Sequence, residues 1–255
     1  MIRGLYNACS GMMVQMARQD VLANNLANVN TAGFKKDIAL SAAFPQMLLQ
    51  RIGEVSESNG SRTPVSPVNI GSLGIGATIS QIATDHSVGM FKATENQTDF
   101  ALKGEGFFTI ETPDGLKYTR NGSFSLTAEG RLVTSDGYPV MGLNGYIETN
   151  GSLSVDEKGN IEVNGSDTET FRIVAFEDKK ALTKVGSSLF DAGDQQGQVD
   201  ENPRIMQNYI EASNVNPVQE MVDLITVVRA YEMSQKMIQA EDQTLDKAVN
   251  TIGSF

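Results

Sequence analysis

Apolar residues recur at alternating intervals of three and four residues at both ends of this chain. Near the N-terminus the positions so spaced are Ile2, Leu5, Cys9, Met12, Met16, Gln19, Ala23 and Leu26. Near the C-terminus they are Met221, Leu224, Val228, Tyr231, Gln235, Ile238, Asp242, Leu245, Val249 and Ile252. This spacing is typical of a coiled-coil seam, and it predicts two long terminal helices that each carry one apolar stripe.

Polar signals mark the inner ends of both predicted helices. Asn216 followed by Pro217 is typical of a helix start, with the asparagine as N-cap and Gln219 placed to complete a capping box. Asparagines crowd residues 24–30 and Gly33 follows, which predicts the end of the N-terminal helix and a turn. Because each amide also offers donors and acceptors, these asparagines, like those of residues 213–216, are equally candidates for bridging neighbouring subunits.

The pattern changes between the two predicted helices. Residues 41–84 hold Pro45, Pro64 and Pro67 with many glycines and serines, which predicts an extended connector. Residues 99–190 carry the turn dipeptides Asp114-Gly115, Asn121-Gly122, Asp136-Gly137, Asn144-Gly145, Asn150-Gly151 and Asn164-Gly165. The alternating runs between these turns predict an antiparallel β domain, in which residues 126–133 and 153–163 form two similar hairpins.

The predicted fold class is therefore α+β. Paired N- and C-terminal helices of coiled-coil type flank the extended connector and the central antiparallel β domain. The predicted parts are an N-terminal helix in residues 1–33, the connector in 34–84, the β domain in 85–208 and a C-terminal helix in 209–255.

Charge and composition argue against several classes of function. The net charge of −11 repels polyanions, so we expect no nucleic-acid partner. No apolar run approaches the ~18 residues of a membrane-spanning helix, and we expect no membrane insertion. The only cysteine, Cys9, excludes an internal disulfide and is expected to be a buried apolar residue. His86 has no cysteine or second histidine near it, so the sequence predicts no metal site, no cofactor and no catalytic residue.

The predicted C-terminal helix is too long for the rest of the chain to cover. From Pro217 to Ile252 it measures roughly 54 Å at 1.5 Å per residue. A β domain of ~110 residues has a radius of gyration of about 13 Å. We therefore expect neighbouring copies of the chain to cover the remaining apolar surface, which produces a helical filament or tube when head-to-tail contacts do not close.

Several sequence blocks resemble the flagellar basal-body rod and hook proteins, in the order that this family has. The blocks are Ala23-Asn24-Asn25-Leu26-Ala27-Asn28-Val29-Asn30-Thr31-Ala32-Gly33-Phe34-Lys35, Leu102-Lys103-Gly104-Glu105-Gly106-Phe107-Phe108, Tyr118-Thr119-Arg120-Asn121-Gly122-Ser123-Phe124, Gly137-Tyr138-Pro139-Val140, Glu211-Ala212-Ser213-Asn214-Val215-Asn216-Pro217 and Arg229-Ala230-Tyr231-Glu232. The single compact β domain is similar to a rod subunit, because hook proteins usually carry a further outer domain. Ser72 to Thr84 resembles distal rod proteins, with proximal rod proteins as the alternative.

The resemblance implies a structural subunit of a tubular drive shaft that transmits torque from motor to hook. It implies that the terminal helices form the innermost layer, that type III export delivers the chain, and that the shaft lies in the periplasm or cell-wall layer. The implied partners are further copies of the chain, other rod and hook proteins and the export apparatus. The residues expected at the assembly interface are Leu5, Met12, Met16, Asn24, Asn25, Leu26, Asn28, Asn214, Leu224, Val228, Tyr231, Ile238 and Leu245.

Two other functions compete with this interpretation. An exported β domain is a plausible scaffold for an enzyme that acts on the cell wall, although no pairing of nucleophile and base supports it. An export or assembly cap would bind helices without becoming part of the structure.

Overall fold

The computed structural model describes residues 2–51, 55–58, 61–64, 68–149, 153–156, 158–163, 166–200 and 203–252. The fold is α+β, as the sequence predicts: helix α1 (Ile2–Ala27), a central region of strands and helix α2 (Pro217–Lys247), which a short π-helix (Ala248–Ile252) extends. The turn predictions at Asn150-Gly151 and Asn164-Gly165 lie outside the described residues.

The chain divides into two compact units. Unit 1 comprises residues 1–22, 39–82 and 221–255, and unit 2 comprises residues 23–38 and 83–220. The chain therefore passes between the units four times.

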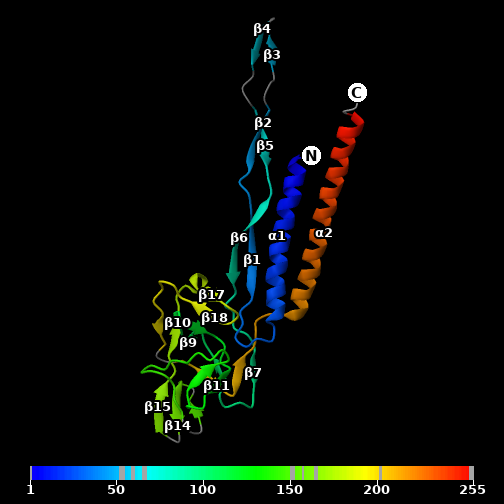
Figure 1. The fold of residues 1–255 in the computed structure, drawn as a ribbon. Coiled ribbons are helices and arrows are strands. Elements are labelled where there is room, and N and C mark those ends of the chain that lie inside the picture. The colour runs from blue at the N-terminus through cyan, green and yellow to red at the C-terminus, as the bar shows by residue number, and fades with distance from the viewer. Residues whose placement is uncertain are drawn as a thin grey trace. The chain divides into compact units, whose positions relative to one another are not determined.

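Unit 1 contains most of both helices and a two-stranded ribbon (Figure 1). The ribbon consists of three nested strand pairs: β1 (Asp37–Ala43) with β6 (Ala77–Thr84), β2 (Met47–Arg51) with β5 (Val68–Leu73), and β3 (Val55–Ser58) with β4 (Ser61–Pro64). The connector expected in this segment is thus a hairpin that folds back along its own length. Pairing of its strands provides hydrogen-bond partners for backbone N–H and C=O groups, which in an unpaired connector would be hydrogen-bonded to water.

Helix α1 contacts both the ribbon and α2 within unit 1. Arg18 Nη2 donates to Ser41 Oγ on β1 at 2.9 Å. A Cβ placed on Gly4 would come 2.5 Å from the Glu241 carboxylate, and one on Gly11 would come 3.7 Å from Ser234 Oγ. The two helices are therefore antiparallel, and small residues of α1 face α2.

Unit 2 contains the β domain and the inner ends of both helices. Its strands are β7 (Phe91–Ala93), β8 (Phe100–Leu102), β9 (Phe107–Thr112), β10 (Gly115–Thr119), β11 (Phe124–Leu126), β12 (Leu132–Thr134), β13 (Leu153–Val155), β14 (Asn160–Val163), β15 (Ser166–Thr170), β16 (Ile173–Ala175), β17 (Thr183–Val185), β18 (Leu189–Asp191), β19 (Gln198–Val199), β20 (Ile205–Gln207) and β21 (Tyr209–Glu211). The largest sheet has the order β17-β18-β10-β9-β16-β19, and the strand pairs in it are antiparallel. A 3₁₀ turn (Lys179–Ala181) precedes β17.

Strand β9 supplies both faces of the largest sheet with buried aromatic rings. Phe108 belongs to the larger apolar cluster with Phe124 and Phe171, whereas Phe107 belongs to a second cluster with Phe190. Successive strand residues point to opposite faces, so one strand fills two cores. The β domain therefore has a complete core within its own chain.

The two similar hairpins are confirmed. β11 pairs with β12, and β13 pairs with β14, both antiparallel. In each loop a glycine adopts positive φ, +82° at Gly130 and +83° at Gly159, and its amide donates to the carbonyl three residues back. Positive φ favours glycine because it has no Cβ, which explains the shared glycine.

The predicted start of α2 is also confirmed. The helix begins at Pro217, and Asn216 Oδ1 accepts a hydrogen bond from the backbone N–H of Val218 at 3.1 Å. This is the N-cap geometry that the Asn-Pro sequence predicts.

The predicted apolar stripes are only partly covered within the chain. On α2 the row Leu224, Tyr231, Ile238 and Leu245 is half-buried, but Met221, Gln235 and Asp242 are exposed, as is Val249 in the π-helix that follows. On α1 the exposed members are Cys9, Met16, Gln19 and Ala23. The side chains buried instead are Val14, Val21 and Val227.

The expectation of a buried Cys9 is therefore wrong. The side of α1 that carries Val14 and Val21 is the buried one, and Cys9 lies on another side of the helix. Sequence periodicity identifies an apolar stripe, but a helix with apolar residues on two sides leaves open which side the chain covers.

We expect Phe108→Ala to lower the free energy of unfolding of unit 2 by about 3–5 kcal/mol, because it removes a fully buried ring and leaves a cavity. Urea denaturation followed by circular dichroism measures this change. Leu143→Ala, at a half-exposed position, is the control and should change stability by less than about 0.5 kcal/mol. Equal losses in the two variants would contradict the core assignment.

Candidate functional site

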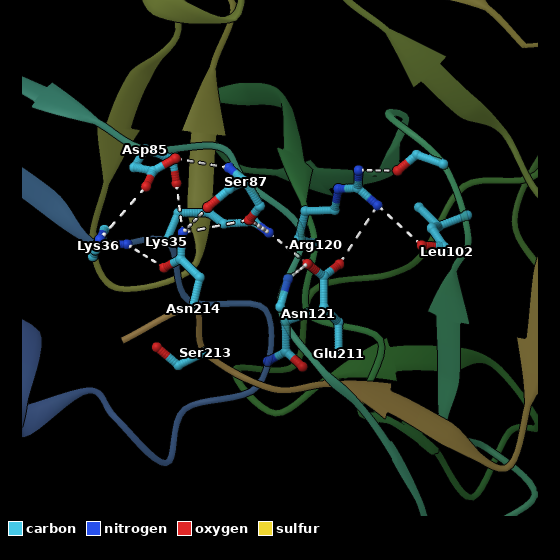
Figure 2. A network of polar contacts seen from close by, with 12 residues as sticks. Lys35, Lys36, Asp85, Ser87, Leu102, Arg120, Asn121, Glu211, Ser213 and Asn214 are labelled. Atoms are coloured by element: carbon cyan, nitrogen blue, oxygen red, sulfur yellow. Dashed lines mark hydrogen bonds and ion pairs between the residues drawn. The ribbon is translucent and has the colours of Figure 1, made fainter. Parts of the chain in front are cut away.

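Three of the sequence blocks meet in unit 2 around one buried carboxylate (Figure 2). Lys35 ends the asparagine-rich block, Arg120 belongs to the block that begins at the end of β10, and Glu211 opens the block that leads into α2. All three side chains are almost completely buried. These residues lie far apart in the sequence, so the fold has to bring them together.

The carboxylate of Glu211 is the centre of this network. Its Oε1 accepts hydrogen bonds from Lys35 Nζ at 2.5 Å and from the backbone N–H of Gly89 at 2.9 Å. Its Oε2 lies 3.5 Å from Arg120 Nη1. The two cations are themselves bonded further, because Lys35 donates to the Ser87 carbonyl at 2.7 Å and Arg120 donates to the carbonyls of Leu102 and Gly104.

Burial and charge act in opposite directions on these cations. Burial lowers the pKa of Lys35, and the charge of Glu211 raises it. The pKa of Arg120 is likewise lowered by burial and raised by Glu211. A buried charge without its partner is costly, so each member of the network depends on the others.

The backbone of Gly33 lies against the same network. Its φ is +68°, and its N–H donates to the Glu211 carbonyl at 2.8 Å. A Cβ at this position would lie 2.3 Å from the backbone nitrogen of Asn121. Both the conformation and the close backbone approach require glycine here.

The asparagines beside the helix ends are mostly engaged within the chain. Asn25 is buried, and its amide both accepts from the N–H and donates to the carbonyl of Asp37, each at 2.9 Å. Asn214 accepts from the N–H of Lys36 at 2.8 Å and donates to the carbonyl of Asp85 at 2.8 Å. Asn25 and Asn214 thus hold the ends of the two helices to other segments of the same chain.

The remaining residues expected at the interface differ in exposure. Met16 and Asn24 are exposed, whereas Leu5, Met12, Leu26, Asn28, Leu224, Val228, Tyr231, Ile238 and Leu245 are half-buried.

The structure adds apolar surface that the predicted seams miss. On α1, Tyr6 and Met13 are exposed with Cys9 and Met16, at alternating three- and four-residue spacing. On α2, an exposed row is formed by Val218, Val222 and Ile225. At ~100° per residue the row on α2 lies opposite the buried Val227, whereas the row on α1 lies about 110° around the helix from the buried Val14 and Val21. The same periodicity search in a shifted register would have found these rows.

The described residues offer no metal site, since they contain no group of three or more His, Cys, Asp or Glu side chains able to hold an ion. Within this part of the chain, no helix is long and apolar enough to span a membrane.

His86 lies among aromatic rings of the second apolar cluster. Its ring centroid is 5.2 Å from that of Phe190 and 6.0 Å from that of Phe107. Burial, followed by the positive charges of Lys35 and Lys179, lowers the pKa of His86 to about 4. The imidazole is therefore neutral near neutral pH and acts as a core group.

The buried charges of this network tie three segments of the chain to one another. Comparison with known proteins identifies the family. The model "Flagella basal body rod protein" matches residues 5–35, "Flagellar hook protein FlgE/F/G D1 domain" matches 101–163, and "Flagellar basal body rod FlgEFG protein C-terminal" matches 206–251.

Relatives are similar over nearly the full chain. The flagellar basal-body rod protein FlgG of Bacillus subtilis is 33% identical, covering 98% of this chain and 99% of the relative. FlgG of Borreliella burgdorferi is 35% identical, and FlgF of Rhizobium meliloti is 34% identical, each with 98% coverage of both chains. This chain belongs to the flagellar basal-body rod protein family. It is a structural subunit of the rod, located in the flagellar basal body, and not an enzyme.

We expect Lys35→Met to destabilise unit 2 by about 3–5 kcal/mol, because it leaves Glu211 buried with an incomplete set of partners. Chemical denaturation measures the loss. Lys117→Met is the control: its pair with Asp191 is also 2.5 Å long, but the aspartate side chain is 38% exposed, and we expect a loss of at most about 1 kcal/mol. A loss no larger than that of the control would contradict the role of the network.

We expect His86 to make stability depend on pH. Its pKa rises to about 6.5 on unfolding, so between pH 6.5 and 4 the unfolded chain takes up a proton that the folded chain does not. The free energy of unfolding should therefore fall by up to about 3 kcal/mol as the pH drops through this range. His86→Leu should remove that part of the slope in denaturation series, and identical slopes would refute the assignment.

Proposed function

We propose that copies of this chain polymerise head to tail into the helical tube of the rod, which transmits torque from motor to hook. The observation that carries this proposal is the pair of exposed apolar rows on α1 and α2. Val14, Val21 and Val227 are the only apolar side chains of unit 1 that are buried, among the described residues. A unit with so little buried apolar surface needs partners to become well ordered.

The exposed rows have the character expected of an interface between identical subunits. Met13 and Met16 are 65% and 53% exposed, and Val222 and Ile225 are 53% and 52% exposed. Single exposed apolar residues are ordinary, but rows at helical spacing mark surfaces that a partner covers. Head-to-tail contacts between such surfaces produce an open helical assembly when they do not close into a ring.

In the assembled rod, we propose, α1 and α2 pair as a coiled coil of the innermost layer, with the β domain outside. In the single chain, a hollow of about 480 Å³ lies beside Gly4, Ala8, Met233 and Met237, so side chains from a neighbouring copy have room to enter. The half-buried row Leu224, Tyr231, Ile238 and Leu245 would then complete its burial together with Leu5, Met12, Leu26 and Val228. Asn24 and Asn28, at the end of α1, would lie at the same interface.

We place the chain in the distal part of the rod, where the other rod and hook proteins are its neighbours. The flagellar type III apparatus exports the chain to this position. Relatives named FlgG and FlgF have nearly equal identity, so this choice rests on Ser72 to Thr84, which resembles distal rod proteins.

Isolated basal bodies carrying this chain with a peptide tag test the proposal by labelled electron microscopy. Many labels along the hook-proximal part of the rod would support a distal subunit, and labels near the motor would indicate a proximal one. A single ring of labels at the growing tip, or none after purification, would favour an assembly cap and refute polymerisation.

We expect Met16→Glu to abolish polymerisation and leave the fold of the monomer unchanged, because the new charge replaces an exposed apolar side chain and cannot be buried unpaired at an interface. Sedimentation and electron microscopy measure assembly, and circular dichroism measures folding. Gln196→Glu introduces the same charge at an exposed polar position of the β domain, outside both rows, and should assemble normally. Wild-type assembly of Met16→Glu would show that this row is not an interface.

A further inference from the structure

The chain crosses between its two units at residues 22/23, 38/39, 82/83 and 220/221. Near each crossing, one residue on the unit 2 side takes part in hydrogen bonds that link the four crossings together. These residues are Asn25 in α1, Asp37 in β1, Thr84 in β6 and Glu220 in α2. We call these four residues the collar.

Asn25 and Asp37 carry the bonds of the collar. The amide of Asn25 makes two bonds to the backbone of Asp37, each 2.9 Å long, and its Nδ2 also donates to Glu220 Oε2 at 3.3 Å. Thr84 Oγ1 donates to Asp37 Oδ1 at 2.7 Å. All four crossings are thus joined by side chains that belong to a single unit.

The collar is fastened to the β domain. Lys184 of β17 donates to Asp37 Oδ2 at 2.9 Å and to the carbonyl of Lys35 at 2.8 Å. Its ammonium also lies 3.7 Å from the centroid of the Phe34 ring. The Asp37 and Lys184 side chains are largely buried, at 17% and 13% exposure. Water therefore competes weakly for these bonds.

We infer that the collar is a mechanical coupling, which makes the four crossings bear force together when torque passes between the units. This inference rests on the proposed role of the chain in torque transmission. A crossing that is pulled alone can open its hydrogen bonds one after another, at low force. When the collar joins the crossings, several bonds are loaded in parallel and must break together, which requires a higher force.

Optical tweezers on the full-length monomer test the inference. One handle is attached to the exposed native Cys9 in α1, and the other to a cysteine introduced by Ala128→Cys, at an exposed position in the β domain. With these handles, force enters unit 2 through α1. Asn25→Ala removes three collar bonds, and we expect the loss of the first rupture event at high force, with gradual extension in its place.

Asp37→Asn is a milder variant in case Asn25→Ala does not fold. It removes the charge that faces Lys184 and keeps an acceptor for Thr84, so the rupture force should fall without disappearing. Asn160→Ala is the matched control, because Asn160 is hydrogen-bonded to Thr170 in the β domain, in another part of unit 2. It should behave as wild type.

A second pair of handles separates coupling from general weakening. With Cys9→Ser, Ala128→Cys and Lys180→Cys, both handles lie in unit 2, and the collar variants should rupture at the wild-type force. The inference would be overturned if the collar variants kept the wild-type force of the first rupture with the Cys9 handle. It would also be overturned if that force fell equally with both pairs of handles. The tweezers measurement uses monomers, so its result does not depend on polymerisation. A failure of the chain to polymerise would refute the proposed function and would leave the force measurement valid.

Discussion

Burial of the Glu211 carboxylate is the constraint on which the arrangement of unit 2 depends. A carboxylate taken out of water needs compensating partners, and Glu211 has hydrogen bonds from Lys35 and the backbone of Gly89 and an ion pair with Arg120. These partners belong to three separate segments of the chain. The buried charge is compensated only if all three segments return to the same place. The network thus sets where the chain leaving α1 and the chain entering α2 meet the β domain, and Gly33 permits their close approach.

The features that follow local rules could be predicted from the sequence. Asn216 caps α2, and the two hairpins have their glycines at positive φ, because capping and turn formation involve neighbouring residues only. The nested strand pairs of residues 37–84 were expected only as an extended segment. Prolines and glycines indicate that a segment is not helical, but pairing over this distance depends on contacts that local patterns do not contain.

The apolar stripes show a different limit of sequence reasoning. Residue type predicted a buried Cys9 and periodicity put it on the apolar stripe of α1, whereas the structure covers Val14 and Val21. An apolar row indicates that something covers it and leaves open whether the cover is the same chain or another copy. The same limit applies to Asn25 and Glu211, whose partners are distant in the sequence. The blocks that resemble the rod and hook family contain both residues, but composition and spacing assigned no structural role to either.

The two units also differ in what holds them together, and this difference bears on assembly. Unit 2 has two apolar clusters and a buried ion network of its own, whereas unit 1 buries few apolar side chains in the described part of the chain. In the proposed polymer, the places where the helices begin and end must be fixed before the subunits join. Directional hydrogen bonds to Asn25 and Asp37 can do this in the monomer, since they specify geometry and apolar contacts alone tolerate sliding. In the proposed assembly the polar collar and the exposed apolar rows are therefore complementary: the collar sets the helix positions in the monomer, and the rows supply the association energy.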